Sequence, residues 1–173
     1  MEMIFDRVMK LIVAEVDGVL TDGTYAEDEI GNTLYKVFNQ KDFLAINEIK
    51  KYYKVVFICD DNKINYNLCK RKNIPFYWGK GEKGKYTALI EVLRKYGVTP
   101  DETIYIGSKI SDRKCIKFIP YSMCPDDAGE YLRDLAWAPF LLGGGKGIFT
   151  ELLDLLQYNI GLIKKNNLIS KIP

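Results

Sequence analysis

The sequence predicts an α/β fold in which a parallel, doubly wound sheet is covered by helices. Two observations lead to this prediction. Short apolar runs recur along the 173 residues, and amphipathic helical patterns separate them. Strands that alternate with helices in this way are joined by right-handed crossovers, which give a parallel sheet. The length fits one ordinary domain, so we expect residues 1–173 to form a single domain.

The predicted strands are apolar runs bounded by charged or turn-forming residues. They are Lys10–Val16, Lys54–Cys59, Pro75–Trp78, Glu102–Ile106 and Tyr121–Met123. The predicted helices carry apolar residues three and four positions apart. They are Asp42–Tyr52, Lys63–Lys72, Lys83–Tyr96, Ser111–Phe118, Ala128–Leu135 and Gly147–Leu156, and a tail follows over residues 158–173. The Lys83–Tyr96 helix places Ala88, Leu89, Val92 and Leu93 on one face, and Gly97 ends it.

One segment departs from this alternation, because residues 24–39 have the pattern of a β-hairpin inserted between the first strand and the first helix. Thr24–Glu27 and Leu34–Asn39 flank the turn-forming residues Asp28, Gly31 and Asn32. The segment is unusually apolar for a free hairpin, with Tyr25, Leu34, Tyr35, Val37 and Phe38. Such side chains are expected to be buried, either against a neighbouring subunit or against their own domain.

The composition excludes several classes of function. The chain has no histidine, which excludes Ser/His/Asp and Cys/His nucleophile systems and histidine-ligated zinc. Its 4 cysteines form no CxxC pair, so free thiols in a reducing compartment fit best. A net charge of +2 with interspersed signs predicts no nucleic-acid or membrane partner. The apolar runs are too short for a membrane span and the N-terminus lacks a signal-peptide core, so we expect a cytoplasmic protein.

Candidate site residues follow four of the predicted strands and loops. The carboxyl ends of parallel strands meet at a crevice, so these residues are expected to converge. They are Glu15, Asp17 and Asp22; Cys59, Asp60 and Asp61; Lys80 and Lys83; and Gly107, Ser108, Lys109, Ser111 and Asp112. Without histidine, any chemistry must rest on carboxylates, lysines, tyrosines or cysteines.

Residues Leu11–Gly23 read LIVAEVDGVLTDG, which resembles the first motif of the haloacid dehalogenase superfamily, a hydrophobic strand followed by DxDGxxTD. The order of the loops resembles the capless family of 3-deoxy-D-manno-octulosonate 8-phosphate phosphatases within it. The matching segments include Val16–Gly23, Ile104–Gly107 and Gly144–Gly147, and the resemblance covers about residues 9 to 157. It implies a Rossmann-like, capless fold whose hairpin assembles homotetramers.

The family's roles transfer to this chain residue by residue. Glu15 takes the place of the nucleophile and of one Mg²⁺ ligand, Asp17 that of the acid/base, and Asp112 that of the surviving acidic metal ligand of the fourth loop. Cys59, Lys83 and Lys109 take the phosphate-binding places. Glu15 is one methylene longer than the family's aspartate, and a misplacement of about 1 Å can cost about 100-fold in rate. Ser108 and Lys109 stand where the family has two aspartates, which predicts that no cofactor is bound, or Mg²⁺ if the chain is active.

Each of these positions also has a plainer interpretation. Glu15 can be an altered but working nucleophile, Cys59 a small buried side chain, and Lys109 a phosphate ligand in place of the metal. Asp17 can serve as a turn former and cap, and Lys83 can be solvated. The glycine run Gly143–Gly147 can close over an adjacent subunit's crevice, bind an anion through its amides, or form a flexible connection.

The pattern of losses also resembles the phosphatase-like C-terminal domain of animal CMP-sialic acid synthetases, in which the nucleophile is replaced and a fourth loop like Gly107–Cys115 remains. This resemblance implies a pseudoenzyme that acts as an oligomerisation or regulatory module in octulosonate (lipopolysaccharide) or sialic acid biosynthesis, with a CMP-sugar synthetase as a partner. The alternative is an active Mg²⁺-dependent phosphoric monoester hydrolase acting on 3-deoxy-octulosonate 8-phosphate or acylneuraminate 9-phosphate.

Overall fold

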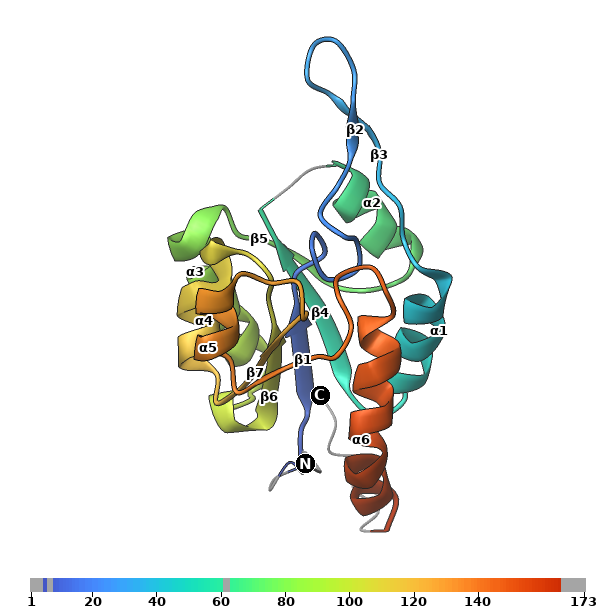
Figure 1. Ribbon diagram of the computed structural model, residues 1–173. Helices are drawn as coiled ribbons and strands as arrows, with labels where there is room; N and C mark the ends of the chain where they lie inside the picture. Colours follow the sequence, from blue (N-terminus) through green and yellow to red (C-terminus); the bar gives the residue numbers. More distant parts are fainter. Residues whose placement is uncertain (1–4, 6–7, 61–62, 166–173) are drawn as a thin grey trace.

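A six-stranded sheet forms the centre of the computed structural model, which describes residue 5, residues 8–60 and residues 63–165 (Figure 1). Its strands are β1 (Leu11–Ala14), β4 (Lys54–Cys59), β5 (Phe76–Trp78), β6 (Thr103–Ile106), β7 (Tyr121–Cys124) and β8 (Ala138–Pro139). They lie in the order β5-β4-β1-β6-β7-β8, and each neighbouring pair is parallel. The predicted parallel sheet is confirmed.

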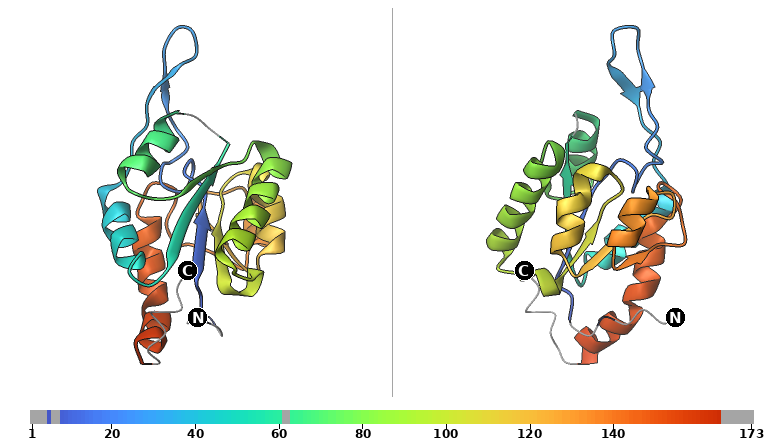
Figure 2. Two further views of the ribbon diagram at one scale, coloured as in Figure 1. Left: turned by 180° about the vertical axis from the view of Figure 1, so that it is seen from behind. Right: turned by 60° about the vertical axis from the view of Figure 1, so that its left-hand side comes forward.

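Helices cover both faces of the sheet (Figures 1 and 2). One layer holds α1 (Gln40–Ile49), α2 (Lys63–Arg71) and α6 (Ile148–Lys165), and the other holds α3 (Gly81–Tyr96), α4 (Arg113–Phe118) and α5 (Glu130–Leu135). Short 3₁₀ turns, η1 (Pro100–Glu102) and η2 (Ile110–Asp112), flank β6. Successive residues of β1 alternate between the two layers, because Ile12 and Ala14 pack in one core cluster and Leu11 and Val13 in the other.

The sheet order places a crevice at the carboxyl end of β1. From β1 the chain extends to β4 and β5 on one side, then crosses to β6, β7 and β8 on the other. Ala14 pairs with Phe57 of β4 and Ile106 of β6, so the next residue, Glu15, emerges between two strand ends. Ligands of open α/β sheets bind at such a switch point.

The hairpin β2 (Ala26–Glu27) and β3 (Thr33–Tyr35) projects beyond this end of the sheet (Figures 1 and 2). Its tip is closed by the Asp28 carboxylate, which accepts hydrogen bonds from the amides of Ile30 and Asn32 and from the Asn32 side chain. Gly31 follows the turn with a φ of 84°, a conformation that favours glycine. The predicted hairpin is therefore confirmed, with a shorter ladder than the sequence indicated.

The apolar side chains of the hairpin are mostly exposed. Tyr25, Leu34, Tyr35 and Val37 are 55%, 59%, 61% and 72% exposed, so packing on their own domain is the wrong interpretation for these four. Phe38 differs, because it packs against the core beside Phe43, with ring centroids 6.1 Å apart.

Several predicted boundaries were wrong. The β8 strand was missed because it has only two residues and one of them is Pro139, which is tolerated at a sheet edge. The α6 helix continues to Lys165, so residues 158–165 are not a tail. Buried Ile160 extends the apolar face of Leu152 and Leu156, and buried Asn159 accepts a hydrogen bond from the Met9 amide at 3.1 Å. These contacts outweigh the roughly 1 kcal/mol penalty of an internal Gly161. The rest of the predicted tail, residues 166–173, lies outside the described residues.

Among the described helices, none is both long enough and apolar enough to cross a membrane.

Candidate functional site

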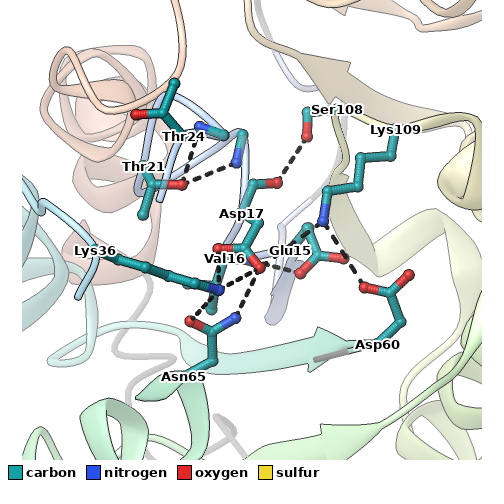
Figure 3. A network of polar contacts seen from close by, with 12 residues as sticks. Glu15, Val16, Asp17, Thr21, Thr24, Lys36, Asp60, Asn65, Ser108 and Lys109 are labelled. Carbon is teal, nitrogen blue, oxygen red and sulfur yellow. Dashed lines mark hydrogen bonds and ion pairs between the residues drawn. The ribbon is translucent and has the colours of Figure 1, made fainter. Parts of the chain in front are cut away.

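The loop after β1 is wound tightly by its own backbone and by Thr21. The amides of Val19, Leu20 and Thr21 donate to the carbonyl oxygen of Val16. The hydroxyl oxygen of Thr21 accepts from the amides of Gly18 and Gly23, at 3.2 and 3.1 Å. The side chain that forms this turn is therefore Thr21, and not Asp17 as the sequence allowed. The Asp17 carboxylate instead points toward Lys36 and Asn65 (Figure 3).

An ion triad is fully buried at the floor of the crevice. Glu15, Lys85 and Asp112 are each 0% exposed. The Lys85 ammonium donates to Oε2 of Glu15 and, at 2.8 Å, to Oδ1 of Asp112. The other Glu15 oxygen accepts from the Val16 amide at 2.9 Å, and the Tyr105 hydroxyl donates to Asp112 Oδ1 at 2.8 Å.

Burial and charge pairing compete within the triad. Burial raises the pKa of Glu15, against the opposing attraction of Lys85. For Lys85, burial alone would lower the pKa, but the carboxylates of Asp112 and Glu15 outweigh it and the pKa is raised. Lys85 is therefore held as a cation at neutral pH, and it cannot serve as a free base.

Cys59 lies fully buried beside the triad. Burial and the neighbouring Glu15 charge raise the pKa of its thiol well above the ordinary value, so the thiol stays protonated. These observations favour the interpretation of Cys59 as a small buried side chain over that of a phosphate ligand.

A second group of charges surrounds Asp17 nearer the surface (Figure 3). Lys36, from the arm of the hairpin, donates to both Asp17 oxygens at 2.8 Å, and the side-chain amide of Asn65 on α2 donates to Oδ2 at 3.0 Å. Lys109 approaches from the other side, with its ammonium 3.8 Å from Asp17 Oδ2 and 3.8 Å from Asp60 Oδ1. Asp17 therefore lies between two lysines.

Asp112 also organises the loop after β6. Its Oδ2 atom accepts from the amides of Ser108 and Lys109, at 3.0 and 2.9 Å. The Ser108 hydroxyl in turn donates to the main-chain oxygen of Asp17 at 2.9 Å, which ties the fourth loop to the first. Gly18 makes this approach possible, because a Cβ there would lie 2.3 Å from Ser108 Oγ.

Most of the predicted site residues are brought together, but Lys80 and Lys83, which are both exposed, are not. Glu15, Asp17, Cys59, Lys109 and Asp112 converge at the ends of β1, β4 and β6. Lys83 is exposed near the start of α3, and Lys85 occupies the buried position instead. Sequence reasoning also missed Lys36 and Asn65. Asp61 lies outside the described residues.

The glycine run packs on the first loop of its own chain. The Gly144 amide donates to both oxygens of Asp127, at 3.0 and 3.1 Å, and the Gly145 amide donates to the carbonyl of Val19 at 2.9 Å. These two amides are already used, which argues against the anion-site interpretation of the run. A Cβ at Gly144 would lie 2.4 Å from the Gly18 carbonyl oxygen. Such close packing also argues against the interpretation of the glycine run as a flexible connection.

The donor set does not suit the Mg²⁺ ion that the resemblance implies. All oxygens of the Glu15, Asp17 and Asp112 carboxylates already accept hydrogen bonds from protein donors. Magnesium needs oxygen ligands at about 2.0–2.1 Å in near-octahedral geometry. Within the described residues, no three carboxylate or thiol groups are arranged to hold a metal ion. The Lys109 ammonium adds positive charge beside Asp17, so the residues present do not fit the ion.

An open pocket of about 400 Å³ lies over the Asp17 group. It is lined by Asp17, Lys36 and Lys109 and, from the hairpin side, by Tyr25 and Thr33. Both lysines can meet an anionic ligand there, but each is already paired with Asp17.

Comparisons with known proteins identify the family of this chain. No family model matches the chain. The 3-deoxy-D-manno-octulosonate 8-phosphate phosphatase KdsC of Haemophilus influenzae is 30% identical over 151 residues, which are 86% of this chain and 82% of the relative. The enzyme of the same name from Escherichia coli K12 is 27% identical over 150 residues, which are 86% of this chain and 79% of the relative.

Solved structures agree in fold. The cobalt-bound form of the deoxy-D-mannose-octulosonate 8-phosphate phosphatase from Haemophilus influenzae has a TM-score of 0.82 at 30% identity, covering 89% of this chain and 90% of that one. The Moraxella catarrhalis 3-deoxy-D-manno-octulosonate 8-phosphate phosphatase, in complex with magnesium, phosphate and KDO, has a TM-score of 0.79. It is 23% identical and covers 91% of this chain and 92% of that one, a likeness of fold alone.

These relatives carry the name of the phosphatase family, and the resemblance to the synthetase domain stays a prediction. The identity to the Haemophilus influenzae protein extends over most of both chains. The chain therefore belongs to the 3-deoxy-D-manno-octulosonate 8-phosphate phosphatase family of the haloacid dehalogenase superfamily.

Proposed function

We propose that this chain is a family member in which Mg²⁺-dependent hydrolysis is lost or severely weakened. It acts as an oligomerisation or regulatory module in acidic-sugar biosynthesis of the octulosonate or sialic acid type. The observation that carries the proposal is the occupation of all the oxygens of Glu15, Asp17 and Asp112 by protein donors.

The state of Glu15 supports this proposal. A carboxylate nucleophile must bring an oxygen to about 3–3.5 Å of phosphorus with its lone pair aimed along the breaking bond. Glu15 is 0% exposed, and its two oxygens are held by the Val16 amide and the Lys85 ammonium. An attack would therefore require it to break a buried ion pair first, which is strongly unfavourable.

The position of the Lys109 ammonium also supports the proposal that Mg²⁺-dependent hydrolysis is lost. This ammonium is a single charge with three donors and no coordination sites, so it cannot replace a dication that gathers oxygens from protein and substrate. It lies 3.8 Å from both Asp17 and Asp60, where it partly neutralises the two acids.

The exposed hairpin supports assembly. Tyr25, Leu34, Tyr35 and Val37 are each more than half exposed, and clustered apolar side chains on a surface mark interaction sites. We propose that the hairpins of several copies pack together in a homotetramer. A CMP-sugar synthetase is the partner to test, on the strength of the sequence resemblance.

The second candidate is an active Mg²⁺-dependent phosphatase of sugar-acid phosphates, which the comparisons favour. The curated relatives at 27–30% identity bear the phosphatase name, and a solved relative at 30% identity is a cobalt-bound form. In that case Glu15 would be the nucleophile, Asp17 the proton shuttle and Lys85, rather than Lys83, the phosphate ligand.

Metal binding and turnover separate the two candidates. Purified protein is titrated with Mg²⁺ by calorimetry and assayed for phosphate release from p-nitrophenyl phosphate and from 3-deoxy-octulosonate 8-phosphate, with and without Mg²⁺. The proposal expects no metal-dependent release by the unaltered chain. Brisk Mg²⁺-dependent release would establish the second candidate.

Restoring the family's aspartates tests whether their replacement explains the loss of metal binding. Glu15→Asp alone should restore little, because Ser108 and Lys109 still deny the metal its ligands. The triple variant Glu15→Asp, Ser108→Asp, Lys109→Asp should bind Mg²⁺ at millimolar concentrations or below. Lys117→Asp, at an exposed lysine on α4, is the control for the replacement of a lysine by an aspartate. A triple variant that folds but binds no Mg²⁺ would contradict the account of the lost site.

Assembly is tested separately. Tyr25→Ser with Tyr35→Ser should give a smaller species in light scattering, and Tyr131→Ser, which is 50% exposed on α5, should not. Phe38 is left unchanged because it packs on the core of its own domain. Unchanged mass in the double variant would remove the hairpin from the assembly.

A further inference from the structure

Lys36 is buried although the hairpin residues on either side of it are exposed. It follows β3, and its neighbours Tyr35 and Val37 are 61% and 72% exposed. The Lys36 side chain is only 2% exposed. A lysine normally keeps its ammonium in water, so this burial needs a specific partner.

That partner is Asp17, and the contact is unusually complete. The ammonium donates to both carboxylate oxygens at 2.8 Å and lies 3.3 Å from Oδ1 of Asn65. Asn65 is itself 0% exposed and donates from its nitrogen to Asp17. Three segments that are distant in sequence therefore meet on one carboxylate: the loop after β1, the arm of the hairpin and the start of α2 (Figure 3).

The remainder of the hairpin is lightly held. Its ladder pairs only Ala26 with Tyr35 and Glu27 with Thr33, with a register shift between the two pairs. Hairpins of this size are marginal on their own in water. At the base, Asn39 reaches the carbonyl of Gly145 at 3.4 Å, a long hydrogen bond. A buried, doubly bonded ion pair is therefore a major determinant of how the arm leaves the domain.

We propose that Lys36 is a positioning residue that couples the crevice to the hairpin. By holding the Asp17 carboxylate it fixes the angle of the arm, so whatever competes for the Lys36 ammonium loosens the hairpin. The coupling is reciprocal by thermodynamic necessity, so contacts that pin the hairpin also pin Asp17. Lys36 lines the pocket above Asp17, where an anionic ligand would meet it. The proposal does not depend on whether the chain hydrolyses phosphate esters.

Hydrogen exchange of the hairpin amides tests the coupling. Lys36→Met keeps the apolar stem and removes only the ammonium, so exchange over residues 24–35 should speed up about 10-fold, equivalent to about 1.4 kcal/mol. Lys36→Arg should restore most of the protection. Lys41→Met, which removes an exposed lysine at the start of α1, should leave exchange unchanged.

A double-variant cycle separates the ion pair from a general structural role. Asp17→Asn should loosen the hairpin as Lys36→Met does, and the two together should give no further acceleration. The double variant also leaves no buried charge unpaired, so it keeps the test available if Lys36→Met folds poorly. Hairpin exchange within twofold of the unaltered protein in Lys36→Met, or equal acceleration by Lys41→Met, would overturn the proposal. Additive effects of the two substitutions would overturn it too.

Discussion

The crevice contains two charged groups of opposite character. Glu15, Lys85 and Asp112 form the inner group, which comes from the loop after β1, from α3 and from η2, and each of the three is 0% exposed. Asp17, Lys36 and Lys109 form the outer group, which comes from loops and the hairpin, and the Lys109 side chain is 37% exposed. Charges enclosed in the interior hold the fold together, whereas a charge near the surface, here the Lys109 ammonium, stays available to ligands.

The difference also bears on the family's chemistry. The nucleophile position belongs to the inner group and the proton-shuttle position to the outer one. In this chain the inner group resembles a structural ion cluster. Substitutions in the two groups should therefore have very different consequences.

The largest effect is expected for Lys85→Met. It leaves the Glu15 and Asp112 carboxylates buried without a cation, which should lower the free energy of unfolding by about 3–5 kcal/mol. Urea denaturation measures the loss. Lys83→Met, on the exposed side of the same helix, should change stability by less than about 0.5 kcal/mol. Equal losses in the two variants would mean that the inner group is not structural.

A compensating change sharpens this result. Glu15→Gln removes one of the two unpaired carboxylates, so adding it to Lys85→Met should recover about 1–2 kcal/mol of the loss. Strictly additive losses in urea would show that Lys85 acts on the fold through contacts other than the ion pair.

Another buried acid, Asp42, shows how burial changes the pKa of a carboxyl group that is not paired with a lysine. Its Oδ1 atom accepts from the Phe149 amide at 2.7 Å at the start of α6, and its Oδ2 atom has no hydrogen-bond partner among the described residues. Burial raises the pKa of Asp42 to about 6, from 3.8, against the opposing backbone hydrogen bonds. The folded state therefore binds this proton more tightly than the unfolded chain.

The sign of the pH effect follows from that shift in pKa. Ionised Asp42 destabilises the fold above pH 6, and its contribution improves as the pH falls from about 7 toward 4. Asp42→Asn should be more stable than the unaltered protein at pH 8, by about 1–2 kcal/mol, and the advantage should shrink at pH 4.5. Thermal unfolding at both pH values checks this. An advantage that is the same at both would refute the shifted titration.

The smallest effect is expected for Lys109→Met. Its ion pairs are 3.8 Å long and partly exposed, so the loss of stability should be below about 1 kcal/mol in urea. Lys114→Met, a lysine that is 55% exposed and 3.8 Å from Glu82, is the matched control. A loss for Lys109→Met as large as that of Lys85→Met would remove the contrast between the inner and outer groups.

The parallel sheet could be predicted because its strands are continuous apolar runs separated by helical patterns, and five of its six strands were found this way. Lys85 could have been found by the same reasoning. It precedes Ala88, Leu89 and Val92 at helical spacing, so it lies on the buried face of α3, whereas Lys83 does not. Asn65 has the same relation to the buried Leu68 and Cys69 on α2.

Lys36 had no such signal. In an exposed hairpin neither face is required to be apolar, so alternation along the strand does not say which side chain turns inward. Its burial depends on a carboxylate 19 positions earlier and an amide 29 positions later, and only the folded chain brings them together. The hydrogen bonds that occupy the oxygens of Glu15, Asp17 and Asp112 also could not be predicted, because no spacing in the sequence reveals them.

The close fit between the glycine run and the first loop has an evolutionary consequence. Gly144 and Gly145 brace the main chain of residues 18–22 from behind, and Ser108 anchors the carbonyl of Asp17. These contacts hold the path of the backbone without using the side chain at position 15. A scaffold of this kind can accept substitutions at its catalytic positions during evolution without unfolding. A fold that once carried a catalytic site can therefore be retained for a different function.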